Sequence, residues 1–446
     1  MVYHQAGIGT YIPPNIATPL MTRVSKTLDE MVAWNLDRHV MDGYEFLMQN
    51  CTFYCVPILI RCSIHRLTFR LYRQSGRSHL YLRFLSTARA LAGMIHKVGL
   101  LPACNHQQVP FAYKMFQRAD ETGWKQSNAF KKAFSVDVDI EFIGVWGTVN
   151  SVGLIPRRLP FTTSNTIVRT FQHAIALDER RAKFKPNLWN RPNTKEQTLI
   201  TSDRNRKAHK KHGHSTTPRL KALERKYTKD HSRQTDVEEV WFSGCHCDVG
   251  GGSVRNDTQH SLARIPLRWM IRECFKTHTG IMFDCEGLQA LGLDPGALYP
   301  EVLPRPPMTA STGTLRIQDI PKPISGAPDE THLPNFADVG GYSSALYKSE
   351  EDHDILDLLS PVYDQLSLAP YIGSSLGTGR FILKQKKRGV KIHGSVKMRM
   401  EALHLNGTKY ARIIREGTCS WNGSVGSLTL WFTRRIVVML VLFLCQ

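Results

Sequence analysis

The residues best suited to chemistry lie in the run Gly244-Cys-His-Cys-Asp-Val-Gly-Gly-Gly, which follows an apolar segment at 237–242. Three successive glycines allow positive φ or a close approach of the backbone to another group, at a cost in chain entropy. A histidine beside such a turn is well placed for proton transfer, because its ordinary pKa lies near neutrality. We therefore interpret His246 as a candidate general base. The alternative interpretation is a tight structural turn that carries an incidental histidine.

Metal and cofactor sites are less well supported by the spacing of their residues. Cys245 and Cys247 could bind zinc together with the histidines at 209, 212 and 214. Structural zinc sites, however, take ligand pairs two to four residues apart from two clusters, and this pattern is absent here. The run Gly7-Ile8-Gly9-Thr10 lacks the third glycine and the preceding strand of a dinucleotide fingerprint. We expect neither a metal nor a cofactor.

The elements that must position His246 follow from hydrophobic periodicity. The segments 136–146 and 237–242 have the alternating or continuously apolar patterns of strands that enter a covered sheet. Helical spacing predicts two helices within 21–48 with a break near Met41-Asp42-Gly43, and further helices at 86–99, 109–120, 167–177 and 262–275. Alternating strands and helices favour the α/β class, whose sites lie in loops that follow strands.

The net charge is the unusual feature of the composition. The chain has 446 residues and a formal net charge of +20, with 42% hydrophobic residues. Residues 46–119 hold ten Lys or Arg and no acid, and residues 204–233 hold eleven with two acids, so the rest is nearly neutral. The segment 204–233 is typical of an exposed, mobile insertion. It has one aromatic residue, Tyr227, so stacking platforms for nucleic acid are missing and we expect no nucleic-acid partner.

Cysteine usage and the chain ends bear on localisation. The ten cysteines are too irregular for a disulfide framework, and we expect a cytoplasmic protein without a signal peptide. The apolar run Ile436–Cys445 is about half the roughly 20 residues that a membrane helix needs. We interpret it as a buried strand or a non-native tail and expect no stable membrane span. A Pro-rich stretch at 294–335 is a plausible linker.

Five motifs occur in the order and spacing of one known family. They are YHQAGIGT at Tyr3–Thr10, STARALAGMIHKVGLL at Ser86–Leu101, FIGVWGTV at Phe142–Val149, HAIALDERR at His173–Arg181 and VWFSGCHCDVGGG at Val240–Gly252. On these motifs the chain resembles the type VI secretion phospholipase effector-like catalytic domain family, a group abundant in fungi. We expect this domain at 1–275, with a non-family stretch at 51–85 and a basic insertion at 191–236, and a C-terminal region of unknown function at 276–446.

The resemblance implies an α/β-hydrolase fold, with a mostly parallel sheet flanked by helices, that cleaves lipid or other carboxylic esters. Such a site uses Ser, Asp and His in that chain order. Carried over by motif, His246 matches the general base, and Asp248 with Gly250, Gly251 and Gly252 matches the turn that presents it.

The other parts of the family's site do not match. The nucleophile elbow is missing, because no Gly-x-Ser-x-Gly pentapeptide precedes Thr87, and Ser86 follows Leu85 without elbow glycines. The family's acid is replaced by Gly147, and the nearby Asp137 and Asp139 lie inside or before the strand rather than after it. The family's first strand, which ends in an Asp-Gly-Thr loop, has no counterpart here. The nucleophile therefore stays unknown.

Two interpretations account for these losses. In one, the chain is a pseudoenzyme that kept the fold and lost the chemistry. In the other, non-coding sequence was read through at roughly 51–85 and near the C-terminus. The abrupt return of family sequence at Thr87 favours this second interpretation. Either way we expect ester hydrolysis to be lost or severely impaired. The alternative function is non-catalytic binding of nucleic acid or anionic membrane through the basic segments, with binding that weakens with salt.

Overall fold

The structure is a computed structural model. It describes the following residues: 2–5, 36–50, 58–61, 79–82, 85–149, 159–181, 184–189, 216–227, 234–255, 258–305, 315–318, 349–364, 366, 390–404, 407–408, 410, 419–424, 427–432 and 440–443. The chain divides into two compact units. Unit 1 comprises residues 1–63, 72–172 and 185–238, and unit 2 comprises residues 64–71, 173–184 and 239–446.

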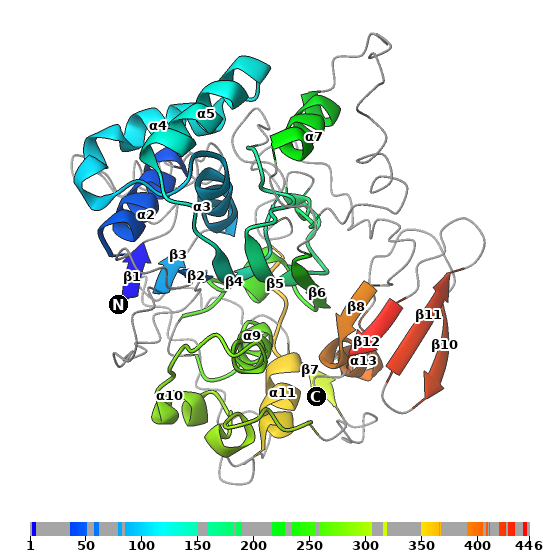
Figure 1. The fold of residues 1–446 in the computed structure, drawn as a ribbon. Helices are drawn as coiled ribbons and strands as arrows, with labels where there is room; N and C mark the ends of the chain where they lie inside the picture. The colour runs from blue at the N-terminus through cyan, green and yellow to red at the C-terminus, as the bar shows by residue number, and fades with distance from the viewer. Residues whose placement is uncertain are drawn as a thin grey trace, which may run out of the picture. The chain divides into compact units, whose positions relative to one another are not determined.

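Unit 1 combines short strands with a group of helices, coloured blue to green in Figure 1. Its elements are β1 (Val2–Gln5), α2 (Leu36–Asn50), β2 (Ile58–Arg61), β3 (His79–Leu82), α3 (Leu85–Val98), a 3₁₀ turn (Ala103–Gln108), α4 (Val109–Gln117), α5 (Glu121–Phe134), β4 (Ile140–Trp146) and α7 (Thr216–Tyr227). The strands β5 (Val168–Ala176) and β6 (Asp236–Phe242) begin in unit 1 and end in unit 2.

The strands of unit 1 confirm the predicted α/β class. Their order is β1-β3-β2-β4-β5, and the pairs β1–β3, β3–β2 and β2–β4 are parallel. Helices α2 to α5 gather beside these strands in Figure 1. Parallel strands need crossover connections that bring helices onto the sheet, so this arrangement follows from the strand directions.

Helix α3 and strand β4 form the core of unit 1, and both were predicted from the sequence. Residues 87–98 of α3 are all buried, and so are residues 142–146 of β4. One buried polar residue of α3, Lys97, finds hydrogen-bond acceptors inside this core. The ammonium group of Lys97 donates to the carbonyl oxygens of Met115 (2.9 Å) and Phe116 (3.0 Å), at the C-terminal end of α4. A cation at this end also matches the helix dipole.

Two predicted features of the first half of the chain were wrong. Residues 168–176, predicted to be helical, form strand β5, and eight of its nine residues are buried, which removes any one-sided pattern. The apolar spacing of that segment coincided with a helical repeat because both faces of the strand are covered. Helix α2 runs unbroken through Met41–Gly43. Gly43 is buried in it, and a mid-helix glycine costs only about 1 kcal/mol, which packing can offset. Residues 21–35 lie outside the described residues.

The basic segment 204–233 was predicted to be mobile, and for residues 216–227 this was wrong. They form helix α7, which buries Leu220 and Leu223 against Trp124 and Phe161. Glu224, also on this helix, accepts a hydrogen bond from the backbone N–H of Phe161 at 2.7 Å. The numerous charged residues made the amphipathic pattern of this helix hard to recognise, since its apolar face consists of Leu220 and Leu223 with the partly buried Tyr227. Residues 204–215 and 228–233 lie outside the described residues.

Replacing Leu223 by alanine should therefore destabilise the protein by about 2–5 kcal/mol, the usual cost of a cavity at a buried leucine. A mobile segment would show no such effect. Urea denaturation followed by tryptophan fluorescence measures this difference, and Trp124 lies in the contact itself. Lys226→Gln on the same helix is the matched control. The side chains of its ion pair with Glu121 are 57% and 50% exposed, so its loss should leave the free energy of unfolding nearly unchanged.

Unit 2 contains the rest of the described elements. These are α8 (His246–Gly250), α9 (Arg264–Lys276), α10 (Cys285–Ala290), a 3₁₀ turn (Pro295–Ala297), β7 (Arg316–Ile317), α11 (Glu350–Leu358), β8 (Val390–His393), α13 (Gly394–Glu401), β9 (Leu403–His404), β10 (Cys419–Ser424), β11 (Ser427–Phe432) and β12 (Leu440–Phe443). Its strands follow the order β6-β8-β12-β11-β10. The pairs β6–β8 and β8–β12 are parallel, and the last two pairs are antiparallel.

Two stretches that lack the family's pattern contain strands. The stretch 51–85 shows no strand periodicity in its sequence, yet it contains β2 and β3, and β3 is followed by α3 after two residues. The C-terminal run 436–445 contains β12, in keeping with the strand interpretation. The division at residues 275 and 276 stays a prediction. Among the helices that the structure describes, none is long and apolar enough to cross a membrane.

Candidate functional site

His246 is the first residue of α8, four residues after β6 ends. The turn between them passes through Gly244, which has φ of 104°, a conformation that favours glycine. A side chain at Gly244 would also meet the Cβ atom of Asp248 at 2.5 Å. Sequence and geometry thus agree that a sharp turn presents His246 at the end of a buried strand.

Three successive backbone N–H groups in this turn each donate to a carboxylate. The N–H of Gly244 donates to Asp178 at 2.5 Å. The N–H of Cys245 donates to Asp248 at 2.9 Å, and that of His246 donates to Glu179 at 3.1 Å. Hydrogen bonds to ionised acceptors are roughly twice as strong as neutral ones. These N–H groups fix the turn and are not available as donors to a developing oxyanion.

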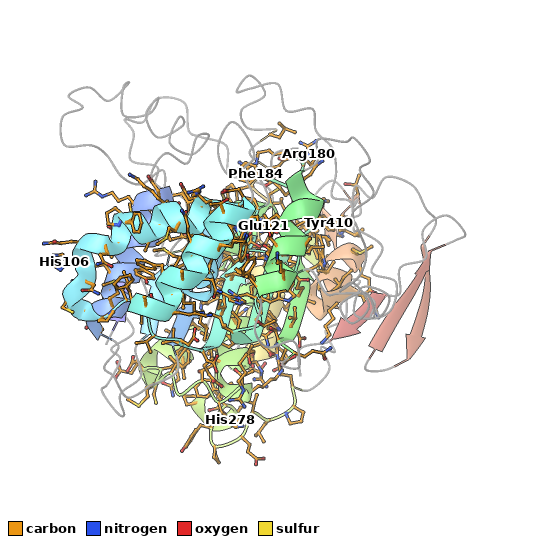
Figure 2. The ribbon with its side chains drawn as sticks, turned by 45° about the horizontal axis from the view of Figure 1, so that its top comes forward. His106, Glu121, Arg180, Phe184, His278 and Tyr410 are labelled. Atoms are coloured by element: carbon orange, nitrogen blue, oxygen red, sulfur yellow. The ribbon has the colours of Figure 1, made fainter. Side chains whose placement is uncertain are left out.

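Arg181 links Glu179 to the ring of His246. Burial raises the pKa of Glu179, but hydrogen bonds and charge from Arg181 outweigh this and lower it to about 2. The guanidinium group of Arg181 lies 3.5 Å from the ring centre of Phe184. The ring of Phe184 in turn meets that of His246 edge-on, at 5.1 Å between centres. The imidazole therefore packs against an aromatic ring that is itself held by the ion pair. Figure 2 labels Phe184 and Arg180, which lie close together.

Asp248 is 1% exposed and is the third residue of α8, where its carboxylate accepts from the backbone N–H of the N-cap residue Cys245. Burial raises the pKa of its carboxyl to about 6, although N–H groups of Cys245 and Tyr363 lower it. Among the three glycines that follow, Gly251 and Gly252 have φ of 82° and 98°. A side chain at Gly250 or Gly252 would meet no atom within 4 Å, so close backbone approach does not explain the run.

Gly147 follows directly on β4, in unit 1, with φ of 56°. Its neighbour Thr148 is fully buried, and its hydroxyl accepts a hydrogen bond from Arg89 at 3.0 Å. Arg89, on α3, also donates to the carbonyl oxygen of Thr162 at 2.6 Å and to that of Asn187. The loop after β4 is thus held by a buried arginine, and its glycine has no side chain for acid–base chemistry.

Comparison with known proteins identifies the family. The sequence matches the family described as "T6SS, Phospholipase effector Tle1-like, catalytic domain" over residues 1–53 and 86–273, more than half of the chain. The chain belongs to the Tle1-like phospholipase effector catalytic domain family. The matched residues include the His246 turn, Gly147 and Arg89, and leave out residues 54–85.

One curated relative is similar over a long alignment. It is the uncharacterized protein YEL023C of Saccharomyces cerevisiae, 27% identical over 372 residues, which cover 61% of this chain and 51% of the relative. The chain thus spans about half the length of that relative. No solved structure matches.

The structure also places the other candidate residues of the Tle1-like site. Asp137 lies before β4 and pairs with Lys131 at 2.5 Å, and Asp139 directly precedes the strand. Both are therefore at the opposite end of β4 from Gly147. Ser86 is the second residue of α3. The zinc interpretation falls partly on His209, His212 and His214, outside the described residues, and within those described no group of His, Cys, Asp and Glu side chains could hold a metal ion.

One Gly-x-Ser-x-Gly pentapeptide does occur in the chain, away from the position that the Tle1-like family uses. It is Gly373-Ser374-Ser375-Leu376-Gly377, which follows His246 in sequence, whereas the family's nucleophile precedes its histidine. It lies outside the described residues. Ser375 is therefore a second serine, besides Ser86, that an activity test must address.

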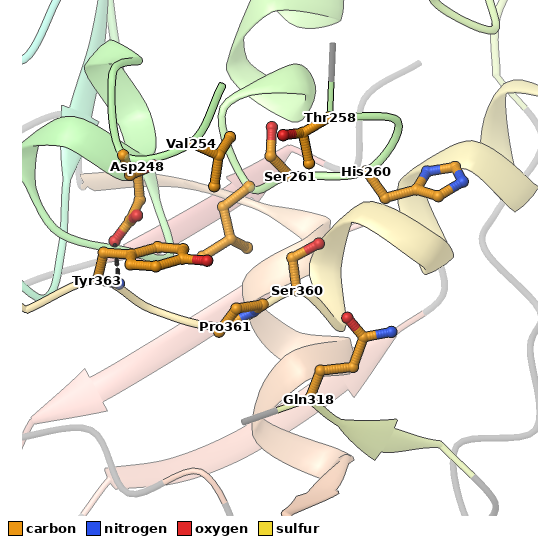
Figure 3. A pocket seen from close by; sticks show the side chains of 11 residues that line it. Asp248, Val254, Thr258, His260, Ser261, Gln318, Ser360, Pro361 and Tyr363 are labelled. Carbon is orange, nitrogen blue, oxygen red and sulfur yellow. Dashed lines mark hydrogen bonds between the residues drawn. The ribbon is translucent and has the colours of Figure 1, made fainter. Parts of the chain in front are cut away.

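A pocket of about 340 Å³, including space open to solvent, lies beside the His246 turn in unit 2 (Figure 3). One wall is Asp248, and much of the rest is hydroxyl-bearing. The lining residues are Asp248, Ser253, Val254, Thr258, His260, Ser261, Leu262, Gln318, Ser360, Pro361 and Tyr363. His246 is not among them, so this pocket assigns no substrate position to the base.

Sequence reasoning missed the partners of the turn. Asp178, Glu179 and Arg181 belong to the motif HAIALDERR, which served only to recognise the family. Four consecutive charged residues directly after a buried apolar segment were the available signal. Asp178 and Gly244 are 66 residues apart, and nothing local to either one indicates their contact.

Proposed function

We propose that this chain is a lipid-ester hydrolase-like protein that retains the family's histidine turn and has lost, or nearly lost, ester hydrolysis. The observation that carries the proposal is Gly147, which stands directly after β4 where the family's acid belongs. Without a carboxylate, the imidazole of a serine hydrolase is not held in the correct tautomer, which lowers kcat by about 10⁴.

The retained geometry supports a base that is held in place without a complete site. His246 sits on a turn fixed by Asp178, Asp248 and Glu179, and each of these carboxylates accepts a backbone N–H. The substrate class that the family implies is a lipid or other carboxylic ester.

The decisive experiment measures ester hydrolysis by the purified full chain beside His246→Ala. The substrates are 4-nitrophenyl butyrate and phosphatidylcholine vesicles, with release of nitrophenol or fatty acid as the readout. We expect both proteins to stay at the rate of the buffer blank. Turnover that His246→Ala abolishes would show an active hydrolase and contradict the proposal. Turnover that His246→Ala leaves unchanged would contradict the role of His246.

Three further variants locate the cause of any result. Gly147→Asp restores a carboxylate at a position whose positive φ aspartate tolerates better than most residues. We expect no gain of activity from it, because the nucleophile is also missing. A gain would mean that a nucleophile is present and that only the acid was lost. Ser86→Ala and Ser375→Ala, made in that active background, would then identify the nucleophile.

A further inference from the structure

The carboxylates that fix the His246 turn are themselves held by residues beyond the family match, which ends at residue 273. Asp248 accepts a second backbone N–H, from Tyr363 at 3.1 Å, drawn as the dashed line in Figure 3. Asp178 accepts a hydrogen bond from the hydroxyl group of Tyr410. Two of the three carboxylates that fix the turn, Asp178 and Asp248, thus have partners both inside the family domain and in the C-terminal part.

A third contact joins the same two parts of unit 2. Arg180, which directly follows Glu179, donates to the carboxylate of Asp364 at 2.5 Å. The backbone N–H of Leu366 donates to the other oxygen of that carboxylate at 3.0 Å. In Figure 2, Arg180 and Tyr410 lie away from His278, which follows α9. Tyr363, Asp364 and Tyr410 thus each contact the turn or the motif that supports it.

The C-terminal residues are anchored independently of these contacts. Arg399, on α13, is 1% exposed and donates to the carbonyl oxygens of Leu358 and Ser360, the latter at 2.7 Å. Its guanidinium group also lies over the ring of Tyr410, 5.0 Å from the ring centre. One buried cation thus holds both the segment that leads to Tyr363 and the ring of Tyr410. Anchored in this way, both can act as rigid supports.

We propose that Tyr363, Asp364 and Tyr410 are positioning residues that fix the turn carrying His246, so that the C-terminal part of the chain is needed to place the base. The inference rests on the proposed function only for the role of His246. Tyr410 acts through Asp178 on the N–H of Gly244, and Asp364 acts through Arg180 on the same motif. Tyr363 acts through Asp248 on the N–H of Cys245.

Amide hydrogen exchange in the full chain tests this directly. In Tyr410→Phe, Asp178 loses one donor, and we expect the amide of Gly244 to exchange about 10-fold faster. The lost hydrogen bond to a charged group weakens the hold on Asp178, and a tenfold change in exchange corresponds to about 1.4 kcal/mol. Tyr299→Phe is the matched control, because Tyr299 is 73% exposed and should leave exchange at residues 244–246 unchanged.

A second arm separates positioning from general loss of stability. Arg180→Met and Asp364→Asn should each accelerate exchange at 244–246, and the double variant should add little to either. Amides of α9, which lies in unit 2 with the turn, report opening of that unit and should exchange at the wild-type rate. The ring signals of His246 in ¹³C-histidine NMR should shift in Tyr410→Phe and stay unchanged in Tyr299→Phe.

Unchanged exchange at 244–246 and unchanged His246 signals in both Tyr410→Phe and Asp364→Asn would overturn the inference. Equal acceleration in α9 would also overturn it, since the residues would then support the whole of unit 2 rather than the turn. Neither readout depends on ester hydrolysis, so the inference and the proposed function can fail separately.

Discussion

Replacing Arg268 by methionine is expected to lower the free energy of unfolding by about 3–5 kcal/mol, the usual cost of breaking a buried ion pair. Arg268, on α9, is 1% exposed and donates to Asp354 at 2.9 and 2.5 Å and to Asp357 at 2.5 Å. Both carboxylates lie on α11 and are fully buried. The variant removes a positive charge that compensates these two carboxylates. In a region of low dielectric, their ionised forms then destabilise the folded state.

The loss should depend on pH with a definite sign. Burial raises the pKa of Asp354, but Arg268 and Arg305 outweigh it and lower the value from 3.8 to about 2. The folded state therefore binds this proton less tightly than the unfolded chain does. The resulting stability is present above about pH 4 and is lost as pH falls toward 2. The difference in free energy of unfolding between the wild type and Arg268→Met should therefore become smaller as the pH falls from about 4 toward 2.

Urea denaturation followed by tryptophan fluorescence provides the measurement, since Trp269 lies on the same helix. The control is Arg118→Met, which removes an ion pair with Asp120 whose side chains are 47% and 45% exposed. That variant should cost less than about 1 kcal/mol, because exposed ion pairs contribute little. A cost below 1 kcal/mol for Arg268→Met as well would contradict the buried network.

Replacing Asp248 by asparagine should stabilise the protein relative to the wild type as pH rises from 4 to 7. Burial raises the pKa of this carboxyl from 3.8 to about 6, so the folded state binds the proton more tightly than the unfolded chain. Ionised Asp248 thus costs stability. The cost is absent below about pH 4, grows up to pH 6 and stays constant above it. Two pKa units correspond to about 3 kcal/mol.

Asparagine keeps an oxygen that can accept from the N–H groups of Cys245 and Tyr363, and it cannot ionise. The free energy of unfolding of the variant minus that of the wild type should therefore increase by about 3 kcal/mol over this range. A pH series of urea denaturation curves measures it. Cys247→Ser, in the same short helix, changes no carboxyl and should give a difference that does not rise. If the difference in free energy of unfolding between Asp248→Asn and the wild type did not change with pH, the carboxyl of Asp248 in the wild type would be solvated.

The sequence alone was sufficient for the elements whose pattern is local. Helix α3 and strand β4 were predicted because their apolar residues form a long repeat or a continuous run. The prediction of a helix was wrong for β5, because a strand that is buried on both faces has apolar residues at positions that also fit a helical repeat. The prediction of a mobile segment was wrong for α7, because its charged residues outnumber the two leucines that it buries. In both cases the environment of the segment, rather than its own residues, decided its structure.

For the candidate site, the sequence by itself determined that a histidine stands on a glycine-rich turn after an apolar segment, and it predicts that a glycine replaces the family's acid. These are properties of residue type and order. Only the tertiary structure decided what holds the turn: Asp178 and Glu179 from the end of β5, and Tyr363, Asp364 and Tyr410 from far along the chain. Buried N–H groups must find acceptors. Which carboxylates supply them depends on contacts between residues up to 232 positions apart, which no local pattern encodes.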